Sequence, residues 1–265
     1  TCALPISLPK GTGESADSLR RTLLTSGVVG TGTLTDRPLP LVLAADRLYL
    51  ARFYRAEQNL GQALRARLSA PPLPVPPAAI AALQALPRSP GADGIDWQLV
   101  GIAAALCSPY SVITGGPGTG KTFTTARLLA LLRHGNPNLR IALAAPTGKA
   151  GSRLSQAIAE HDPAAPAATT LHRLLEYSPL EDRFRHGPER PLPHDVVIVD
   201  EASMIDLELM TTLLLALRPA AAEAARMPRA TRPAPSIWKP SRSITFPTMP
   251  RRAGSRAPLA CQRWA

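Results

Sequence analysis

The sequence predicts an α/β fold, a parallel β-sheet with helices on both faces. Two short apolar segments, Ile141–Ala145 and Val196–Val199, lack the polar alternation of a half-solvated strand, so each is expected to be buried between two layers. Segments with apolar residues at helical spacing alternate with these strands along the chain. A glycine-rich loop over residues 115–120 stands between a predicted strand and the next helix. This order is typical of sheets whose strands are connected by helices.

A small, mainly helical domain is predicted over residues 11–69. Glu14–Ser26 has the apolar spacing of a helix, and Phe53–Leu68 has an apolar stripe typical of an amphipathic helix. Between them, Leu41–Leu43 and Leu48–Leu50 are short apolar runs that predict a hairpin or a strand pair. The N-terminal domain is therefore expected to combine helices with a short β-ribbon.

A proline-rich segment separates this domain from the predicted sheet. Residues 70–77 contain five prolines and predict an extended linker, because proline cannot continue a helix. The sheet domain is expected over residues 78–217. Its expected elements are a helix at Ile95–Leu106, a strand at Ser111–Thr114, helix Thr122–Arg133, strand Ile141–Ala145, helix Gly148–Ala159, a short helix at Thr170–Leu175, strand Val196–Val199 and helix Ile205–Leu217.

The two ends of the chain differ from the rest. Thr1–Ser7 resembles the translation of a sequencing adapter, so residues 1–10 are expected to be an artefact or disordered. Residues 218–265 hold eight prolines and no sustained apolar period. They are either a disordered basic tail or a frameshifted end, and the second interpretation is favoured. This tail holds ten Lys or Arg against Glu223 alone, so the net charge of +11 says little about the folded part.

The cysteines favour a reducing compartment. Cys2, Cys107 and Cys261 are far apart and form no CxxC pair, which predicts neither a disulfide framework nor a zinc site. Cys107, within an apolar helical pattern, is expected to be a reduced core residue. No apolar run approaches the roughly 18 residues of a membrane span, and no signal peptide opens the chain. A cytoplasmic location is expected.

An eight-residue segment fits the phosphate-binding pattern GxxxxGK[ST]. Its glycines allow backbone N–H groups to surround phosphate oxygens, and the following helix directs its N-terminus at the same anion. Lys121 is expected to reach the β- and γ-phosphates, and Thr122 to bind Mg²⁺. The alternative is a glycine-rich turn. The predicted nucleotide-binding positions are Gly115, Gly116, Pro117, Gly118, Thr119, Gly120, Lys121 and Thr122. A P-loop NTPase fold is therefore predicted, with ATP and Mg²⁺ as cofactors.

Two carboxylates follow the last predicted strand. Asp200 and Glu201 come directly after Val196–Val199, about 80 residues beyond the P-loop. Asp200 is expected to hold Mg²⁺, through water or through Thr122, and Glu201 to act as general base on the attacking water. With Lys121 they form the predicted catalytic set. An exposed acidic turn is the alternative.

Gln98 lies 17 residues before Gly115. A Gln amide offers a donor and an acceptor together, which matches the edge of adenine. A single surface Gln is an equally good interpretation.

Small polar residues follow two further predicted strands. At the carboxyl edge of such a sheet, where ligands bind, they could hold a phosphodiester without reading base sequence. The alternatives are a plain strand-to-helix turn for the first group and a cap or packing role for His172. The predicted DNA-binding residues are Pro146, Thr147, Gly148, Lys149, Thr170 and His172.

In this order and spacing, Gln98, GGPGTGKT, APTGKA, TTLHRLL and VVIVDEASMID resemble the first motor domain of superfamily 1 DNA helicases. Among these the sequence most resembles the RecD family, the alpha subunits of exodeoxyribonuclease V. The segment LVLAADRLYLARFYRAEQNL resembles the small domain that precedes that motor. The resemblance covers about residues 14–217. It implies an ATP-driven 5′→3′ helicase on single-stranded DNA, with RecB-like and RecC-like partner subunits, in double-strand break repair and recombination.

The sequence departs from the family in two respects. Gly151 stands where the family usually has Ala. More importantly, the family continues to a strand ending in Gly-Asp…Gln and to a second RecA-like domain with arginine fingers. Residues 218–265 contain neither pattern. The chain is therefore expected to be a truncated fragment that at most binds ATP–Mg²⁺. The alternatives are a nucleotide- or subunit-binding module without turnover, and another P-loop ATPase of the AAA+ type.

Overall fold

The computed structural model describes most of the first 218 residues. The described ranges are residues 3–5, 15–32, 39–45, 47–91, 93–116 and 118–218. Every described residue belongs to one compact unit. Cys2, Pro117 and the predicted tail beyond Arg218, which includes Cys261, lie outside the described residues. No helix in the described ranges is long and apolar enough to cross a membrane.

The N-terminal part contains a four-stranded sheet and two helices. Its elements are β1 (Ala3–Pro5), α1 (Ala16–Thr25), β2 (Val29–Thr31), β3 (Leu41–Ala44), β4 (Arg47–Leu50) and α2 (Ala51–Leu68). The strand order is β1-β4-β3-β2, with β2 parallel to β3 and the other pairs antiparallel. The pairing of β3 with β4 confirms the predicted strand pair, and both predicted helices are present. The short strands β1 and β2 were not predicted, and β1 lies within the residues set aside as an artefact.

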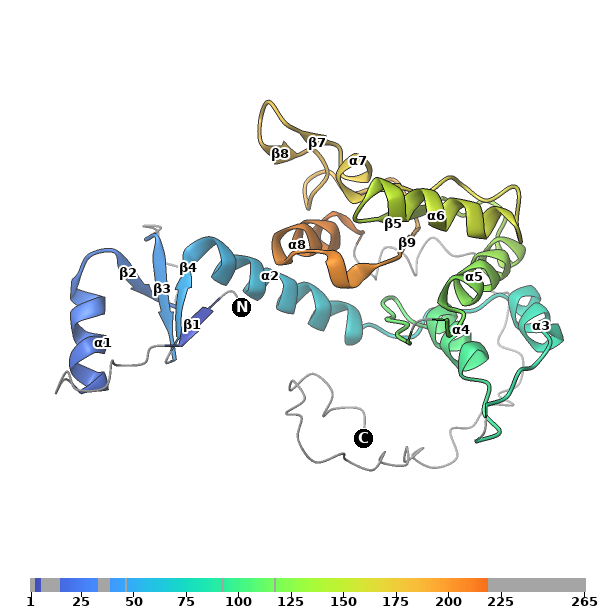
Figure 1. Cartoon of the computed structure of the whole chain (residues 1–265), viewed down its shortest axis with the longest axis horizontal. Coiled ribbons are helices and arrows are strands. Elements are labelled where there is room, and N and C mark those ends of the chain that lie inside the picture. Colours follow the sequence, from blue (N-terminus) through green and yellow to red (C-terminus); the bar gives the residue numbers. More distant parts are fainter. Residues whose placement is uncertain are drawn as a thin grey trace. The chain divides into compact units, whose positions relative to one another are not determined.

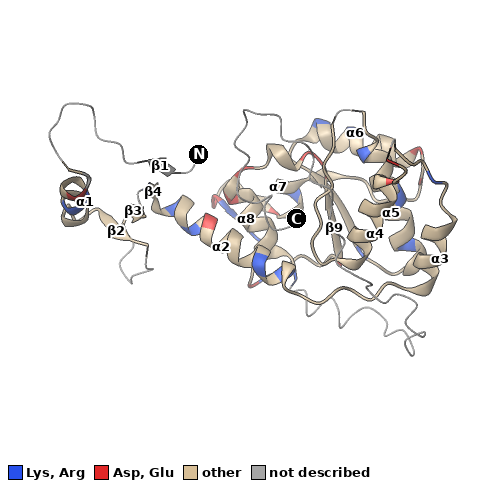
Figure 2. Ribbon diagram, turned by 90° about the horizontal axis from the view of Figure 1, so that it is seen from below, with Lys and Arg blue, Asp and Glu red and all other residues tan. Residues whose placement is uncertain are grey.

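Helix α2 connects this sheet to the rest of the molecule (Figure 1). It follows β4 without a loop and packs along α8 (Leu207–Ala216). The Thr211 hydroxyl donates to the Ala56 carbonyl at 3.1 Å. Arg67 is 6% exposed and donates to the carbonyls of Leu214, Leu217 and Arg218 at 3.0–3.3 Å. Arg67 thus caps the carboxyl end of α8. The charged residues of α2 are mostly basic, with Glu57 as its one acidic residue (Figure 2).

The central sheet has three parallel strands. They are β5 (Ile141–Ala145), β6 (Thr169–Thr170) and β9 (Val196–Val199), in the order β6-β5-β9. All five residues of β5 are buried, as predicted for a strand covered on both faces. The four residues of β9 are only half-buried, so the expectation of a buried strand is wrong there. The reason is that β9 has a ladder partner on one side only within the described sheet.

Helices cover both faces of this sheet, which confirms the predicted fold class. The helices are α5 (Lys121–Gly135) and α6 (Gly148–Ala159) on one face, and α7 (Leu171–Leu174) and α8 on the other. The two faces follow from the alternation of side chains along β5. Ile141 and Leu143 pack in the cluster with α5 and α6, whereas Ala142 and Ala144 pack in the cluster with α7 and α8.

The segment before the P-loop is not a strand. Ser111–Thr114 forms no ladder with any described strand, and Val112 is 71% exposed. The prediction rested on a local apolar run, but a strand also needs a neighbour, and the partners of β5 are β6 and β9. This prediction is therefore wrong for the structure.

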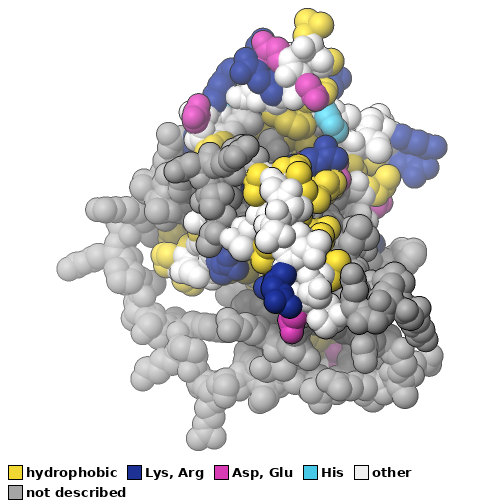
Figure 3. Space-filling model, turned by 90° about the vertical axis from the view of Figure 1, so that its left-hand side faces the viewer, with side chains coloured by type: hydrophobic (Ala, Val, Ile, Leu, Met, Phe, Trp, Pro, Cys, Tyr) yellow, Lys and Arg dark blue, Asp and Glu magenta, His cyan; other side chains and the backbone are white. Residues whose placement is uncertain are grey.

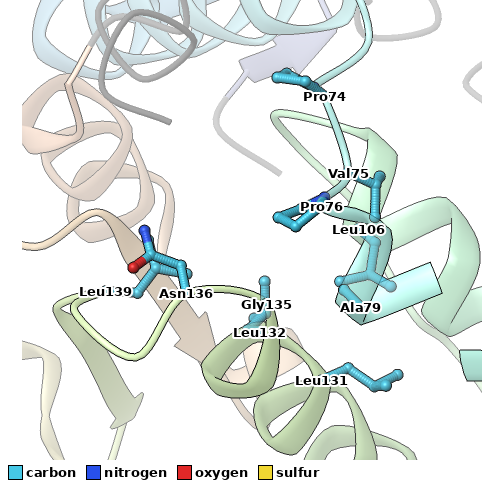
Figure 4. Close-up of a pocket in the computed structure, with 10 residues that line it drawn as sticks. All are labelled: Pro74, Val75, Pro76, Ala79, Leu106, Leu131, Leu132, Gly135, Asn136 and Leu139. Atoms are coloured by element: carbon cyan, nitrogen blue, oxygen red, sulfur yellow. The ribbon is translucent and has the colours of Figure 1, made fainter. Parts of the chain in front are cut away.

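Two helices pack beside α5. They are α3 (Pro77–Ala85), which was not predicted, and α4 (Trp97–Cys107). Ile102 and Leu106 of α4 are buried against α5, but Cys107 is exposed. The predicted core position of Cys107 is wrong because that residue falls on another face of α4. A pocket of about 20 Å³, enough for one or two waters, remains between the linker and these helices (Figure 4).

A short hairpin follows α7. It consists of β7 (Tyr177–Ser178) and β8 (Arg183–Phe184), neither of which was predicted. Leu180 in its loop is fully exposed. Basic, acidic and apolar side chains lie next to one another over this hairpin, at the top of Figure 3.

Candidate functional site

The glycine-rich loop has a conformation that requires two of its glycines. Gly118 and Gly120 have φ values of +73° and +79°, in the left-handed region that side chains with a Cβ avoid. A Cβ on Gly115 would lie 2.6 Å from the Thr119 hydroxyl oxygen. A Cβ on Gly120 would lie 2.7 Å from the amide nitrogen of Gln98. The loop is thus closely packed at the positions where the pattern demands glycine.

Helix α5 begins directly after this loop. Gly120 is its cap residue, and no side chain caps this end, so the N–H groups of the first turn remain available to an anion. The Lys121 ammonium donates to the carbonyl oxygens of Gly115 and Gly116 at 2.8 and 2.9 Å. Charged phosphate oxygens accept stronger hydrogen bonds than neutral carbonyls. Lys121 can therefore exchange the loop carbonyls for phosphate.

The structure brings Gln98 to the P-loop. Its side-chain nitrogen donates to the Thr119 carbonyl at 3.1 Å. Asp96 caps α4 by accepting the N–H groups of Gln98 and Leu99, each at 3.1 Å. The N–H of Ser89 also donates to Asp96 and lowers the pKa of that carboxyl. Sequence reasoning missed Asp96, although an Asp directly before an apolar helical run is a capping signal.

The acidic pair lies where β9 ends. The N–H of Asp200 donates to the Ala144 carbonyl at 3.0 Å, and the Asp200 carboxylate accepts the N–H of Glu201 at 2.9 Å. Glu201 has a φ of +53°, a conformation that costs on the order of 1 kcal/mol for a residue with a Cβ. Neither carboxylate forms an ion pair with a described residue. Both carboxylates thus remain available for a cation or for water.

The predicted DNA contacts share one edge of the sheet. β5 and β6 are parallel neighbours, with Ala145 opposite Thr170, so the residues that follow the two strands lie near each other. Thr147 caps α6 by accepting the N–H of Ala150 at 3.3 Å, and Thr170 caps α7 by accepting that of Arg173 at 3.2 Å. These hydroxyl oxygens therefore serve local structure, while each hydroxyl keeps its hydrogen to donate.

The other predicted contacts on this edge are at the surface. Thr147, Gly148 and Lys149 are exposed, and Pro146 is half-buried. His172 is exposed, with ring centroids 5.5 Å from Tyr177 and 5.7 Å from Phe184. Its packing role is therefore real, and it does not prevent contact with a ligand. 

Thr122 and Asp200 are the two predicted Mg²⁺ ligands. Thr122, which is half-buried at the start of α5, and Asp200 share no hydrogen bond within residues 118–218. The Asp200 carboxylate instead accepts the backbone N–H of Glu201. A metal held by Thr122 and Asp200 together stays a prediction.

Comparisons with known proteins agree with this geometry. A family model for the AAA domain matches residues 98–224. The RecBCD enzyme subunit RecD of Mycolicibacterium smegmatis is 44% identical over 202 residues, which is 70% of this chain and 35% of that protein. The chain is homologous to the RecD helicases.

Two other relatives cover different shares of the chain. The RecD subunit of Haemophilus influenzae is 44% identical over 140 residues, 47% of this chain and 22% of that protein. The ATP-dependent RecD2 DNA helicase of Deinococcus radiodurans is 35% identical over 209 residues, 72% of this chain and 26% of that protein. The chain spans about a third of the length of the first of these relatives. An AAA domain implies nucleotide binding by this region.

Proposed function

We propose that this chain binds ATP–Mg²⁺ as the N-terminal part and first motor domain of a RecD-type DNA helicase. The observation that carries the proposal is the P-loop, with two left-handed glycines, a helix end without a side-chain cap and Lys121 at the start of that helix. A P-loop alone indicates only nucleotide binding. The homology to RecD is the reason for proposing a DNA helicase. Neither the partner nor the reaction follows from the loop alone.

The nucleotide is proposed to lie over the start of α5. Lys121 and the loop N–H groups would hold its phosphates, and Gln98, already bonded to the loop, would face the base. Thr122 and Asp200 would bind Mg²⁺, which neutralises phosphate charge and orients the phosphates. Glu201 would hold the attacking water and accept its proton.

Single-stranded DNA is the proposed second ligand. The residues after β5 and β6 present Lys149, small residues and N–H groups at one exposed edge. Such contacts address the phosphodiester backbone and do not distinguish bases. RecB-like and RecC-like subunits are the proposed protein partners, because a relative of this chain is a subunit of the RecBCD enzyme.

The proposed activity of the 265-residue chain is nucleotide binding without DNA-stimulated turnover. The resemblance assigns the arginine fingers to a second RecA-like domain, and the described residues contain only the first. Loss of such an arginine lowers phosphoryl-transfer rates by on the order of 10³–10⁵. The test is ATP hydrolysis by the purified chain with and without single-stranded DNA. We expect a rate at background level in both cases, and robust DNA-stimulated hydrolysis would overturn this part of the proposal.

A further inference from the structure

A hollow of about 320 Å³ lies beside the first half of β5. It arises because β6 has only two residues and pairs with β5 only at Ala144 and Ala145. Hydrogen bonding alternates along a strand, and the carbonyls of Arg140 and Ala144 accept from the β9 side. The N–H and C=O groups of Ile141 are therefore directed to the hollow, where no described strand lies opposite them. The hollow thus contains a short open strand edge.

The walls combine apolar surface with a few polar groups. Leu174, Pro166 and Pro193 contribute apolar surface, and Arg173 and His194 contribute side chains with N–H donors. Arg173 is exposed and forms no ion pair with a described residue. The Nδ1 atom of His194 is buried without a hydrogen-bond partner among the described residues. These are the features of a small-ligand pocket, which is mostly apolar with a few convergent polar groups.

The remaining charges of the hollow largely compensate one another. Glu176 lies 3.4 Å from His186 Nε2 and 3.6 Å from Arg190. His186 Nδ1 lies 3.0 Å from the Arg190 carbonyl, so this ring is already fixed. Burial, with a contribution from Arg140, lowers the pKa of His194. Arg173 is then the uncompensated charge at the rim, and an anionic group fits it.

The hollow borders the candidate DNA residues, because Thr169 and Arg173 in its wall adjoin Thr170 and His172, but it does not border the P-loop. Its wall includes the first three residues of β5 and the segment before β9, whereas the P-loop, Asp200 and the residues after β5 lie outside it. None of the predicted nucleotide-binding or DNA-binding side chains lines it. Its chemistry therefore does not follow from the proposed ATP site.

We propose that this hollow binds the carboxyl-terminal end of an extended peptide. The N–H and C=O of Ile141 would pair with a peptide amide, as an added strand does at a sheet edge. The terminal carboxylate would bind Arg173, with His194 as a further donor. Pro166, Leu174 and neighbouring apolar walls would cover one apolar side chain. The volume, at the lower end of ligand pockets, admits a chain end and excludes a long segment.

The test uses the whole chain and a matched pair of probes. N-acetyl-alanyl-leucine carries the amide, the apolar side chain and the carboxylate, and its C-terminal carboxamide lacks only the charge. We expect the acid to bind by isothermal titration calorimetry and the carboxamide to bind at least tenfold more weakly. Arg173→Met should weaken binding of the acid at least tenfold. Arg153→Met, an exposed arginine of α6 outside the hollow, should leave it unchanged.

A second measurement reports on the strand edge. The acid should slow hydrogen exchange of the Ile141 amide, and acetate at the same concentration should not. Equal binding of acid and carboxamide, unchanged binding by Arg173→Met, or no protection of Ile141 would each overturn the proposal. Equal binding of acetate would reduce the hollow to a simple anion site and overturn the peptide assignment.

Discussion

Gly120→Ala tests the packing between the P-loop and Gln98. The φ of +79° at Gly120 costs a residue with a Cβ about 1–2 kcal/mol. The added Cβ would also lie 2.7 Å from the Gln98 amide nitrogen, so this side chain must move and lose its 3.1 Å hydrogen bond to the Thr119 carbonyl. That bond contributes about 1 kcal/mol. We expect Gly120→Ala to lower the free energy of unfolding by about 2–3 kcal/mol.

Gly118→Ala is the matched control. Gly118 has a similar φ of +73°, but nothing lies within 4 Å of its Cβ position, so only the backbone cost of about 1–2 kcal/mol applies. The assay is urea unfolding of both variants and the parent chain, monitored by circular dichroism. Gly120→Ala should be the less stable variant by about 1 kcal/mol. Equal loss in the two variants would refute the assigned role of Gln98.

Three further predictions concern the rest of the fold. Gly151→Ala should raise the free energy of unfolding by about 1 kcal/mol, because its Cβ would meet only ordinary contacts at 3.7 Å; the urea midpoint should rise accordingly. Asp195→Asn should lower the free energy of unfolding by about 1 kcal/mol at pH 7, because the Arg140 hydrogen bond, which lowers the pKa of Asp195, stabilises the charged carboxylate. The difference in stability between the parent chain and Asp195→Asn should shrink as the pH falls below about 4. Urea unfolding of both chains at several pH values measures it. Arg67→Met should lower stability by about 3 kcal/mol by leaving buried carbonyls unpaired; Arg65→Met, an exposed change, should remain within about 0.5 kcal/mol in the same assay.

The sequence was sufficient where structure depends on local pattern. Ile141–Ala145 and Val196–Val199 form strands with the predicted bounds, because each is a short unbroken apolar run between polar segments. It was insufficient where a partner decides the outcome. Ser111–Thr114 carries a strand-like pattern, yet no described strand pairs with it. The single ladder partner of β9 likewise explains its half-buried side chains, which no local pattern indicates.

The candidate site shows the same division. The left-handed Gly120 is a glycine that GxxxxGK[ST] fixes, whereas Gly118 stands at a variable position of the pattern. The spacing of Gln98 left two interpretations open, and only the tertiary structure brings it to Thr119. Arg67 caps a helix about 150 residues away in the sequence. The residues around Arg67 contain no pattern that predicts this contact. 

The most direct test of the central claim is binding of ATP–Mg²⁺ to the 265-residue chain and its Lys121→Ala variant, measured by isothermal titration calorimetry. Lys149→Ala is the control, because it removes an exposed lysine outside the P-loop. We predict that the parent chain and Lys149→Ala bind with the same affinity and that Lys121→Ala binds at least tenfold more weakly. Unchanged affinity in Lys121→Ala would contradict the assignment of the P-loop as the nucleotide site.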